Sequence, residues 1–552
     1  MLSIAEKIIL EIVSQKSLTT ATVDNAWRDI LRTEKRKKII PLKSELLKAY
    51  HKLVKSGKVA KNATLEKLLI KRGVRTLSGV AIVTVLTKPF PCPGKCVYCP
   101  TEARMPKSYI SDEPAAARAL GLKFDPFRQV QSRLDTLALN GHPTDKIELI
   151  VKGGTWNSYP LNYQYWFVLR CFEAANQMSL RGPANRRGRS NLFEFSKQRG
   201  IASRLSDARN DLPQAQKKNE KAKHRIVGLT LETRPDFVNE KTIAVMRELG
   251  CTRIELGVQT TDEKILKLIK RGHNAQAAKD ATQLLKNYGF KVDYHLMPQL
   301  PGATPAKDLK MMKEIFSNPD YRPDMIKIYP CTVVENSELF EWLKKGEYKT
   351  YSDRKLIDII KKFKTTVPYY VRISRLIRDI PSHHIKAGNK MTNLRQVIQK
   401  EMGQEGLKCN CLRCREAGHQ KISNKQLTTN KIKLFINKYE AGGGTEYFLS
   451  FEDKKREMVY AFCRLRLNKK SSQALYPAFI RELHTYGQMI PISQSGDVQH
   501  LGMGKALLRK AEKICEKNKI KKLAVISGVG VRGYYRKLGY QLENGYMVKN
   551  LS

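Results

Sequence analysis

The chain has 552 residues, more than one ordinary domain needs, and this length suggests about three or four domains. Hydrophobic residues make up 41% of it, enough to form buried cores, yet no apolar run approaches the roughly 20 residues that cross a bilayer, which excludes a membrane-spanning helix. Lys and Arg number 101 against 52 Asp and Glu, a net charge of +49. This excess favours binding to a polyanion, the alternative being a protein that is merely soluble and basic.

Residues 1–75 are predicted to form a basic helical region. Ser3 and Glu6 have capping-box spacing and isoleucines recur every fourth residue, so residues 1–16 indicate an amphipathic helix rather than a secretory signal. Runs of Lys and Arg follow with few acids between them: Arg32, Lys35, Arg36, Lys37, Lys38, Lys43, Lys48, Lys52, Lys55, Lys71, Arg72 and Arg75. We interpret these runs as a nucleic-acid-binding surface, the alternative being a solvated helical face.

Residues 76–390 show short β-rich runs that alternate with helix-length stretches. The runs fall at residues 80–87, 147–151, 227–231, 253–258, 291–296 and 325–329. This alternation predicts an α/β fold, a partial (β/α)6 barrel with its site at the carboxyl ends of the strands. Residues 181–225 are polar, basic and rich in Gly and Asn, and we interpret them as a mobile insertion that helps to hold RNA.

Six of the eleven cysteines fall in two tight groups, which indicates metal binding or catalysis rather than disulfides and favours a cytoplasmic protein. The first group, Cys92, Cys96 and Cys99, follows the first predicted strand with C-x3-C-x2-C spacing. Three thiolates on one loop can hold three irons of a [4Fe–4S] cluster and leave the fourth iron open to S-adenosylmethionine (SAM). A zinc loop is the alternative, although no fourth ligand lies near it in the sequence.

This cysteine loop resembles that of the radical SAM superfamily. Gly153 and Gly154 follow the second predicted strand, where the family carries a Gly-Gly loop. Further motifs lie in or at the ends of the next three strands, at residues 232–235 (E-T-R-P), 255–259 (E-L-G-V-Q) and 295–302 (H-L-M-P-Q-L-P-G). The resemblance implies that the glycines let the backbone meet the SAM amino group. It also implies that an electron from the cluster cleaves SAM to a 5′-deoxyadenosyl radical.

The second group, Cys409, Cys411 and Cys414, lies in a predicted connector at residues 391–430. Its C-x-C-x2-C spacing favours structural zinc, with His419 or Cys331 as the fourth ligand. The alternatives are a second iron–sulfur cluster or cysteines that merely happen to be close. A zinc ion here would join two domains, because its binding free energy contributes to folding.

Residues 431–552 are predicted to form a compact α/β domain, with strands at residues 447–451, 459–467, 479–486 and 522–526 and a helix at 502–518. The sequence Q-H-L-G-M-G-K at residues 499–505 opens this helix. Backbone N–H groups at a glycine-rich helix start can hold a pyrophosphate. The form Q-x-x-G-x-G, followed by Tyr534 and Tyr535, resembles the acetyl-CoA site of the GNAT acetyltransferases, the alternative being that these tyrosines only pack.

Both halves on one chain resemble the catalytic subunit of Elongator, in the archaeal stand-alone form of that family. The resemblance runs from about residue 77 to the end. It implies that the strand of Glu482, Leu483, His484 and Thr485 pairs with the pantetheine arm of acetyl-CoA. It also implies that Met503, Gly504 and Lys505 bind the pyrophosphate and that Tyr535 contacts the thioester. Lys146 would bind coenzyme A from the barrel.

The resemblance implies an acyltransferase-class enzyme that converts the wobble uridine of tRNA to 5-carboxymethyluridine. The deoxyadenosyl radical would activate the acetyl methyl of acetyl-CoA, that carbon would add to uridine C5, and thioester hydrolysis would follow. The uridine would come from an anticodon stem-loop, where a base leaves its stack easily. The alternative is a protein lysine acetyltransferase with a structural cluster. The sequence leaves open which tRNAs bind, which external electron donor acts and whether the chain forms a homodimer.

Overall fold

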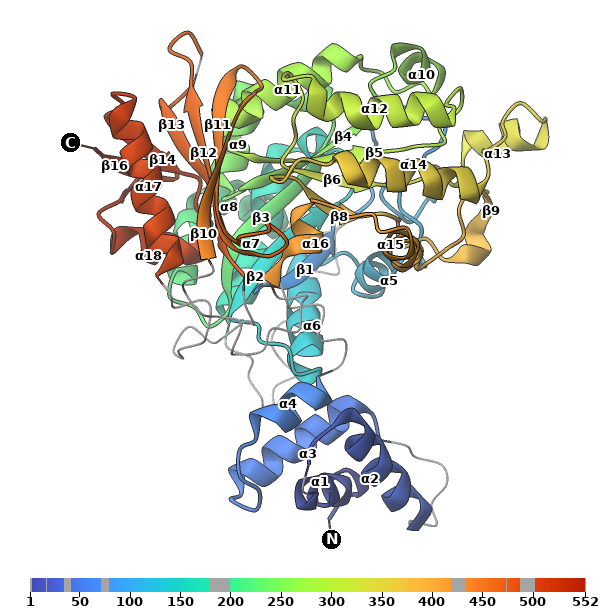
Figure 1. The fold of residues 1–552 in the computed structure, drawn as a ribbon, viewed down its shortest axis with the longest axis vertical. Coiled ribbons are helices and arrows are strands. Elements are labelled where there is room, and N and C mark those ends of the chain that lie inside the picture. Colours follow the sequence, from blue (N-terminus) through green and yellow to red (C-terminus); the bar gives the residue numbers. More distant parts are fainter. Residues whose placement is uncertain are drawn as a thin grey trace.

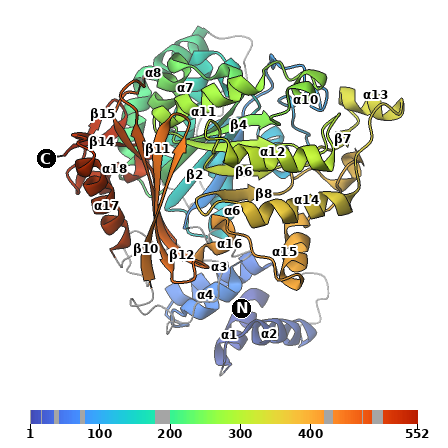
Figure 2. The same cartoon turned by 45° about the horizontal axis from the view of Figure 1, so that its top comes forward.

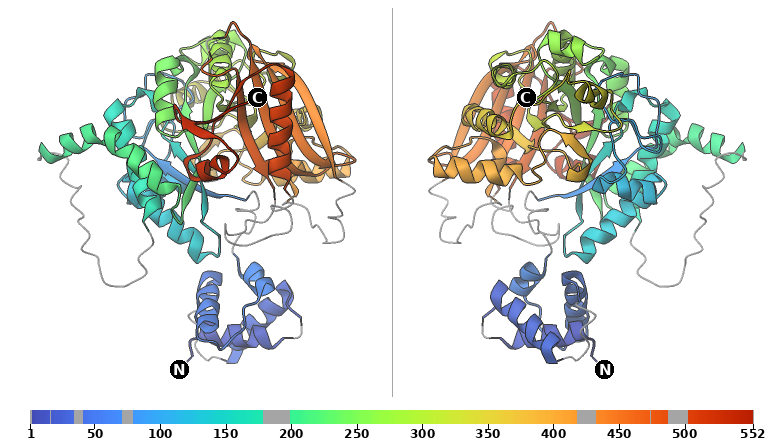
Figure 3. Two further views of the ribbon diagram at one scale, coloured as in Figure 1. Left: turned by 90° about the vertical axis from the view of Figure 1, so that its left-hand side faces the viewer. Right: turned by 90° about the vertical axis from the view of Figure 1, so that its right-hand side faces the viewer.

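The computed structural model describes residues 2–15, 17–33, 41–70, 79–177, 199–417, 432–472, 474–486 and 502–551 (Figure 1). Two mixed α/β units lie against each other, and a helical bundle from the start of the chain stands at one end of the molecule (Figures 1 and 3). No helix in these ranges is long and apolar enough to cross a membrane.

The bundle at the start of the chain has an apolar core of its own. Its described helices are α1 (Ile4–Ser14), α2 (Thr20–Thr33), α3 (Lys43–Lys55) and α4 (Ala63–Leu69). The predicted capping box is present, since the Ser3 N–H donates to Glu6 Oε2 at 2.7 Å and the Glu6 N–H donates to Ser3 Oγ at 3.2 Å. Ile8, Leu46 and Tyr50 are fully buried between the helices. The basic residues at 35–38 and at 71, 72 and 75 lie outside the described ranges.

A seven-stranded sheet of parallel strands forms the centre of the molecule, in the order β1-β2-β3-β4-β5-β6-β8. Its strands are β1 (Ala81–Leu86), β2 (Lys146–Lys152), β3 (Arg225–Thr233), β4 (Arg253–Gln259), β5 (Lys291–Leu296), β6 (Met325–Ile328) and β8 (Arg372–Arg375). The six predicted strands are confirmed. The seventh, β8, was not predicted, because a four-residue strand with an arginine at each end carries almost no β signal.

Helices cover the outside of this sheet (Figure 2). They are α5 (Pro114–Gly121), α6 (Pro126–Leu139), α7 (Leu161–Asn176), α8 (Arg199–Asn219), α9 (Glu240–Glu248), α11 (Ala275–Asn287), α12 (Pro305–Ser317) and α14 (Asp353–Thr366). Helices α10 (Glu263–Leu268) and α13 (Glu338–Lys344) pack instead beside Cys96 and Val97. Helix α11 illustrates why these segments are helical. At its start the Asn274 side chain accepts from the Ala277 N–H at 2.9 Å. Along its length Ala278, Ala281 and Leu285 face the core.

The interpretation of residues 181–225 as one mobile insertion was wrong for its second half. Residues 199–219 form helix α8, and β3 begins at Arg225. Ala208, Leu212 and Ala215 are buried at helical spacing, so a narrow apolar stripe holds this polar helix on the core. The prediction missed that stripe because it used the overall composition, which is dominated by the surrounding Lys, Arg and Asn residues. Residues 181–198 lie outside the described ranges.

The second sheet, from the end of the chain, has the order β10-β11-β12-β13-β14-β16-β15. Its strands are β10 (Ile432–Ala441), β11 (Gly444–Asp453), β12 (Val459–Asn468), β13 (Ala478–Thr485), β14 (Lys522–Val525), β15 (Gln541–Glu543) and β16 (Tyr546–Asn550). Helix α17 (Met503–Lys517) connects β13 to β14, the one parallel pair among these described strands. The predicted strands and helix are confirmed, whereas β10, β15 and β16 were not predicted.

Strands β13 and β14 part soon after they meet. They pair from Ala478 to Ile480 only, opposite Leu523 to Val525. Strand β13 continues to Thr485, where β12 is its one partner among the described strands. The edge of its second half is therefore turned toward a gap instead of a neighbouring strand.

A buried cluster of charges joins the two sheets. Arg481 of β13 donates to Asp324, beside β6, at 2.7 Å and to Glu446 of β11 at 2.9 Å. Lys286 of α11 lies 3.4 Å from Asp324, and all four side chains are fully buried. Burial opposes ionisation of Asp324, but Arg481 and Lys286 hold its pKa well below the usual range. Breaking such a buried pair costs about 3–5 kcal/mol, so the two units are tied together.

Candidate active site

A single cavity of about 1260 Å³ runs from the barrel to the second sheet. Cys92 and Cys99 line it at the carboxyl ends of the barrel strands, and Lys146 lines it farther along. Glu482 and Tyr535 line it from the second unit. The two predicted centres, which lie almost 400 residues apart in the sequence, therefore open into one space.

The loop after β1 carries Cys92, Cys96 and Cys99, and neighbouring loops hold it in place. The Val97 N–H donates to the Ile269 carbonyl at 3.2 Å, and the Val97 carbonyl accepts from the Leu339 N–H at 2.8 Å. The three Sγ atoms do not form a group within 4.8 Å of one another. One zinc ion would draw its thiolates closer than this, whereas a [4Fe–4S] cluster binds each thiolate on a different iron.

Arg271 gives this loop a positive neighbour. Its Nη1 donates to Cys96 Sγ at 3.4 Å, and its Nη2 donates to the Gly257 carbonyl. A hydrogen bond from Cys99, together with Arg271, lowers the pKa of Cys96 to about 4 against the opposing effect of burial. The thiolate is the form that binds metal, so the surroundings of Cys96 suit a ligand.

The predicted Gly-Gly loop lies directly beside the cysteines. Gly153 has a φ of +150° and Gly154 a φ of +88°. A Cβ at Gly153 would lie 1.8 Å from Thr87 Oγ1, so only glycine fits. The next residue, Thr155, brings its Oγ1 to 3.8 Å from Cys92 Sγ. The two motifs therefore form one wall of the cavity.

Arg234, in the predicted E-T-R-P motif, faces the same corner of the cavity. It donates to both carboxylate oxygens of Asp236, at 2.9 and 2.8 Å. Its third nitrogen, Nη1, is buried without a hydrogen-bond partner among the described residues and lies where a Cβ on Gly94 would be. An unpaired buried guanidinium nitrogen beside three cysteines fits an anionic ligand such as the SAM carboxylate.

The middle of the cavity contains a network of charges that was not predicted from the sequence. His295 Nε2 lies 3.0 Å from Glu255 Oε2, and both Lys152 and Lys327 form ion pairs with Glu255. Burial lowers the pKa of Lys327 to about 8 and raises the pKa of Asp293, whose carboxylate oxygens have no hydrogen-bond partner in the described chain. A sequence feature that could have predicted this network is a charged residue inside an otherwise apolar strand, as in Met-Ile-Lys-Ile of β6.

The second unit lines the other end of the cavity. Glu482, Leu483, His484 and Thr485 border it along the part of β13 that has left β14. Lys146 of β2 borders it from the barrel side, and burial lowers the pKa of this lysine. Lys146 and residues 482–485 therefore border the same space from the two units.

The glycine-rich helix start and the tyrosine pair lie at this same end. Gly504 and Lys505 line the cavity at the start of α17, and Met503 is buried there. Tyr534 and Tyr535 belong to α18 (Arg532–Arg536), and Tyr535 is buried against Tyr540 with ring centroids 5.9 Å apart. Residues 499–501 of the predicted loop lie outside the described ranges.

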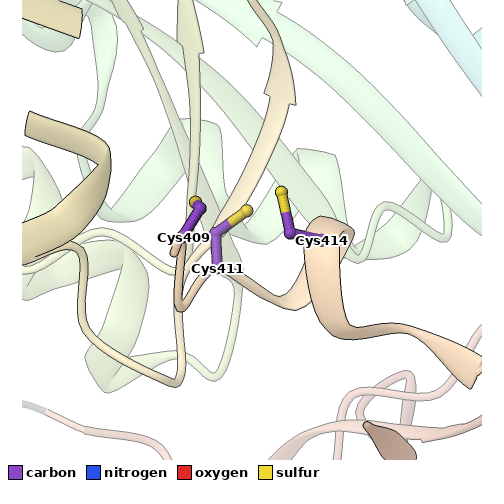
Figure 4. Close-up of side chains that lie close together, drawn as sticks. All are labelled: Cys409, Cys411 and Cys414. Atoms are coloured by element: carbon purple, nitrogen blue, oxygen red, sulfur yellow. The ribbon is translucent and has the colours of Figure 1, made fainter. Parts of the chain in front are cut away.

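The second cysteine group lies in the connector, between the sheets (Figure 4). Cys409 and Cys411 lie between helices α15 (Leu394–Gln404) and α16 (Leu412–Arg415), and Cys414 lies in α16. The Sγ atoms of Cys409, Cys411 and Cys414 lie within 4.8 Å of one another, and Lys364 donates to Cys409 Sγ at 3.3 Å. Cysteine hydrogen bonds and Lys364 hold the pKa of Cys411 well below its usual range. Three crowded thiols beside an ammonium group are the donor set of a compact metal site.

Cys331 was wrong as a candidate fourth ligand. It is buried with Val333 and Leu339 beside the first cysteine loop, because the chain turns toward that loop after β6. It does not belong to the described group formed by Cys409, Cys411 and Cys414. His419, the other candidate, lies outside the described residues.

A parallel half-barrel with three cysteines after its first strand defines a radical SAM protein, and the comparisons agree. The Radical SAM superfamily model matches residues 202–315, and the Radical_SAM C-terminal domain matches residues 323–404. A tRNA uridine(34) acetyltransferase of Methanocaldococcus infernus is 44% identical over 94% of this chain and 96% of its own. Human Elongator complex protein 3 is 36% identical over 87% of this chain and 85% of its own.

A solved structure agrees with these sequence relatives. The archaeal Methanocaldococcus infernus Elp3 with an N-terminus deletion has a TM-score of 0.71 and 42% identity, and the match covers 86% of this chain and 100% of that one. The chain therefore belongs to the Elongator complex protein 3 family, which includes the tRNA uridine(34) acetyltransferases.

Proposed function

We propose that this chain is a tRNA-modifying enzyme that carboxymethylates the wobble uridine at C5, with acetyl-CoA as the carbon source. The observation that carries the proposal is the single cavity shared by the cysteine loop and the parted strands β13 and β14. A protein with two unrelated activities has no need for this shared space. The relatives named tRNA uridine(34) acetyltransferase support tRNA as the substrate, as does the net charge of +49.

In this proposal Cys92, Cys96 and Cys99 hold a [4Fe–4S] cluster, and Arg234 with the Gly153–Gly154 backbone positions SAM. Bound there, the two cofactors would supply a 5′-deoxyadenosyl radical that takes a hydrogen from the acetyl methyl. After that carbon adds to uridine C5, the adduct would lose the C5 proton and return one electron, and water would cleave the thioester. The cavity walls must exclude water and other hydrogen donors from that radical. An external donor must supply the electron.

At the other end, the edge of β13 at residues 482–485, where β13 has left β14, would pair with the amide groups of the pantetheine arm. Backbone N–H groups at Met503, Gly504 and Lys505 would hold the pyrophosphate, with Lys146 adding charge from the barrel. Tyr535 would lie by the thioester. The buried charges around Glu255 and Lys327 lie between the two ends, where a uracil ring and a hydrolytic water would need hydrogen-bond partners.

The three crowded cysteines of the connector belong in this proposal to a zinc site that holds the two units together. Leu412, in the same turn, donates through its N–H to the Val371 carbonyl beside β8 at 2.8 Å. Arg415, one residue after the last cysteine, donates to Glu452 of β11 at 2.8 Å. A metal-bound turn would therefore fix contacts to both units.

The test is anaerobic reconstitution with iron and sulfide, followed by addition of SAM, a reductant, acetyl-CoA and tRNA. Mass spectrometry of the digested nucleosides should find 5-carboxymethyluridine, and deoxyadenosine should form in parallel. The alternative, a protein lysine acetyltransferase with a structural cluster, predicts acetylated protein amines without deoxyadenosine. Unmodified tRNA together with acetylated lysines would decide for that alternative.

A further inference from the structure

Asp112, His383 and His384 form a cluster of metal-ligating side chains far from every cysteine in the sequence. Their ligand atoms lie within 4.8 Å of one another. His384 Nε2 is 2.8 Å from Asp112 Oδ2, and His383 Nε2 is 3.7 Å from the same oxygen. All three side chains are reached by solvent, with the two imidazole rings 4.2 Å apart between centroids.

The cluster brings together side chains from segments that follow the two edge strands of the open barrel sheet. Asp112 lies in the loop that follows β1, the first strand in the sheet order, and both histidines follow β8, the last strand. Because the described sheet does not close on itself, no strand pairing links these edges. The cluster is therefore a place where one ligand could connect the first and last strands of the barrel.

The backbone around the cluster is already fixed. His383 and His384 lie in a short 3₁₀ turn (Ser382–His384), in which the His384 N–H donates to the Pro381 carbonyl at 3.1 Å. Arg378 reaches back to the loop of Asp112, donating to Ser108 Oγ at 3.0 Å and to Glu113 at 2.8 Å. These bonds keep the two segments together without a metal, so little ordering would be needed to bind one.

We propose that Asp112, His383 and His384 bind one divalent transition-metal ion of the class that prefers imidazole, such as Zn²⁺ or Ni²⁺. Two imidazoles and one carboxylate are a suitable donor set for such an ion, and water would complete the coordination. The nearby Glu335 already pairs with Lys386 at 2.6 Å and is left out of the set. This site shares no residue with the cysteine groups.

The ion would stabilise one wall of the cavity by linking two segments that form it. Glu113 and Arg378, which bridge the two segments, line the cavity, and so do Asp379 and Ile380. A metal ion bound by Asp112 and the two histidines would hold the segments that carry these wall residues together. Asp112, His383 and His384 are not among the residues that line the cavity, so a structural role fits better than a catalytic one.

Isothermal titration calorimetry with Ni²⁺ tests the proposal, because nickel favours nitrogen and oxygen donors over crowded thiolates. The protein is the full chain without a histidine tag, with its cysteine groups loaded. His383→Ala, His384→Ala and Asp112→Asn should each weaken the tightest Ni²⁺ binding by about tenfold or more, since even outer-shell changes cost about that much. Ni²⁺ should also raise the melting temperature of the unsubstituted protein.

Two controls keep the result specific. His51→Ala removes an exposed histidine of α3 and should leave the Ni²⁺ affinity unchanged. Cys171→Ser, at a buried cysteine of α7 outside both cysteine groups, should also retain the binding. Because the three ligand residues are accessible, their variants should melt like the parent without added Ni²⁺. Equal Ni²⁺ affinity in the parent and in the His383→Ala and His384→Ala variants would overturn the proposal.

Discussion

Cys96 is the cysteine of the first loop with the most defined surroundings, since it is buried and accepts a hydrogen bond from Arg271. The function proposed for the chain depends on this thiolate and on the coenzyme A end as separate binding sites that serve one reaction. Substitutions of single residues can therefore remove one function and spare the other.

We expect Cys96→Ser to abolish both deoxyadenosine and 5-carboxymethyluridine, because serine is a poor iron ligand, while acetyl-CoA binding stays near normal. Calorimetry with acetyl-CoA and mass spectrometry of nucleosides give the two readouts. Cys171→Ser is the matched control, a buried cysteine of α7 outside both groups, and should keep its activity. Full tRNA modification by the Cys96→Ser protein would refute the radical mechanism.

Lys146→Ala should weaken acetyl-CoA binding several-fold. This lysine belongs to the barrel yet borders the same space as the parted strand β13. A partly exposed lysine–phosphate contact is worth about 1 kcal/mol or less, so loss of binding should be partial. Lys241→Ala, at an exposed position of α9, is the control for removing one charge. The same affinity in both variants would show that Lys146 does not contact coenzyme A.

Gly153→Ala should destabilise the protein and impair SAM binding. A methyl group there would meet Thr87 Oγ1 at 1.8 Å, and the φ of +150° disfavours any L side chain. Such local strain costs about 1–3 kcal/mol, which urea unfolding would measure. Gly121→Ala, at the end of α5 with nothing within 4 Å, should be neutral or slightly stabilising. A Gly153→Ala protein as stable as the parent would contradict this geometry.

At the scale of elements, the connector is the segment whose fold would depend most on the proposed zinc ion. Its described part has two short helices, and its cysteines crowd around Lys364 without any extended apolar core of their own. Three thiolates this close would repel one another, and a bound zinc ion would remove that repulsion.

Metal analysis of aerobically purified protein should therefore find zinc and no second iron–sulfur absorbance from this group. Cys411→Ser should lose that zinc and unfold at lower denaturant concentration, because the metal's binding energy is part of the folding energy. Cys463→Ser, at a buried cysteine of β12, controls for the loss of a buried thiol. Retention of zinc by the Cys411→Ser protein would show that the metal is bound elsewhere.

How much the sequence predicted also differs by element. Short β-rich runs that alternate with helix-length stretches predicted the six barrel strands, and the glycine-rich motif at residues 499–505 predicted the start of α17, because pattern and motif order agreed. Strand β8 was missed, since its four residues include two arginines, and helix α8 was hidden by its polar surface. The charge network around Glu255 was also missed, because its members come from separate strands and meet only in the folded sheet.

The whole molecule combines a basic helical bundle with a two-part catalytic unit. The bundle has its own core, separate from the large core that the two sheets share. It stands apart from both sheets in the views of Figure 3. This separation would suit the tRNA-binding role predicted for residues 1–75, in which the bundle would hold the body of the tRNA while the anticodon loop reached the cavity.

Deletion of residues 1–75 should weaken tRNA binding and flatten its dependence on salt, because fewer phosphates are neutralised. Binding measured by fluorescence anisotropy over a range of salt concentrations would give both quantities. The truncated protein should still bind acetyl-CoA, which controls for folding of the remainder. Unchanged tRNA affinity at every salt concentration would exclude the bundle as a platform.

The buried charge cluster between the sheets has a consequence for synthesis of the chain on the ribosome. Asp324 leaves the ribosome well before Arg481, which follows it by 157 residues. Until that arginine emerges, the carboxylate has Lys286 but no counterion from the second sheet and is costly to bury, so we expect the start of β6 to stay hydrated. We expect nascent chains that end before residue 481 to be cut by protease near Asp324, and chains that extend beyond the last strand to resist. Completion of the barrel thus waits for the last domain to be translated.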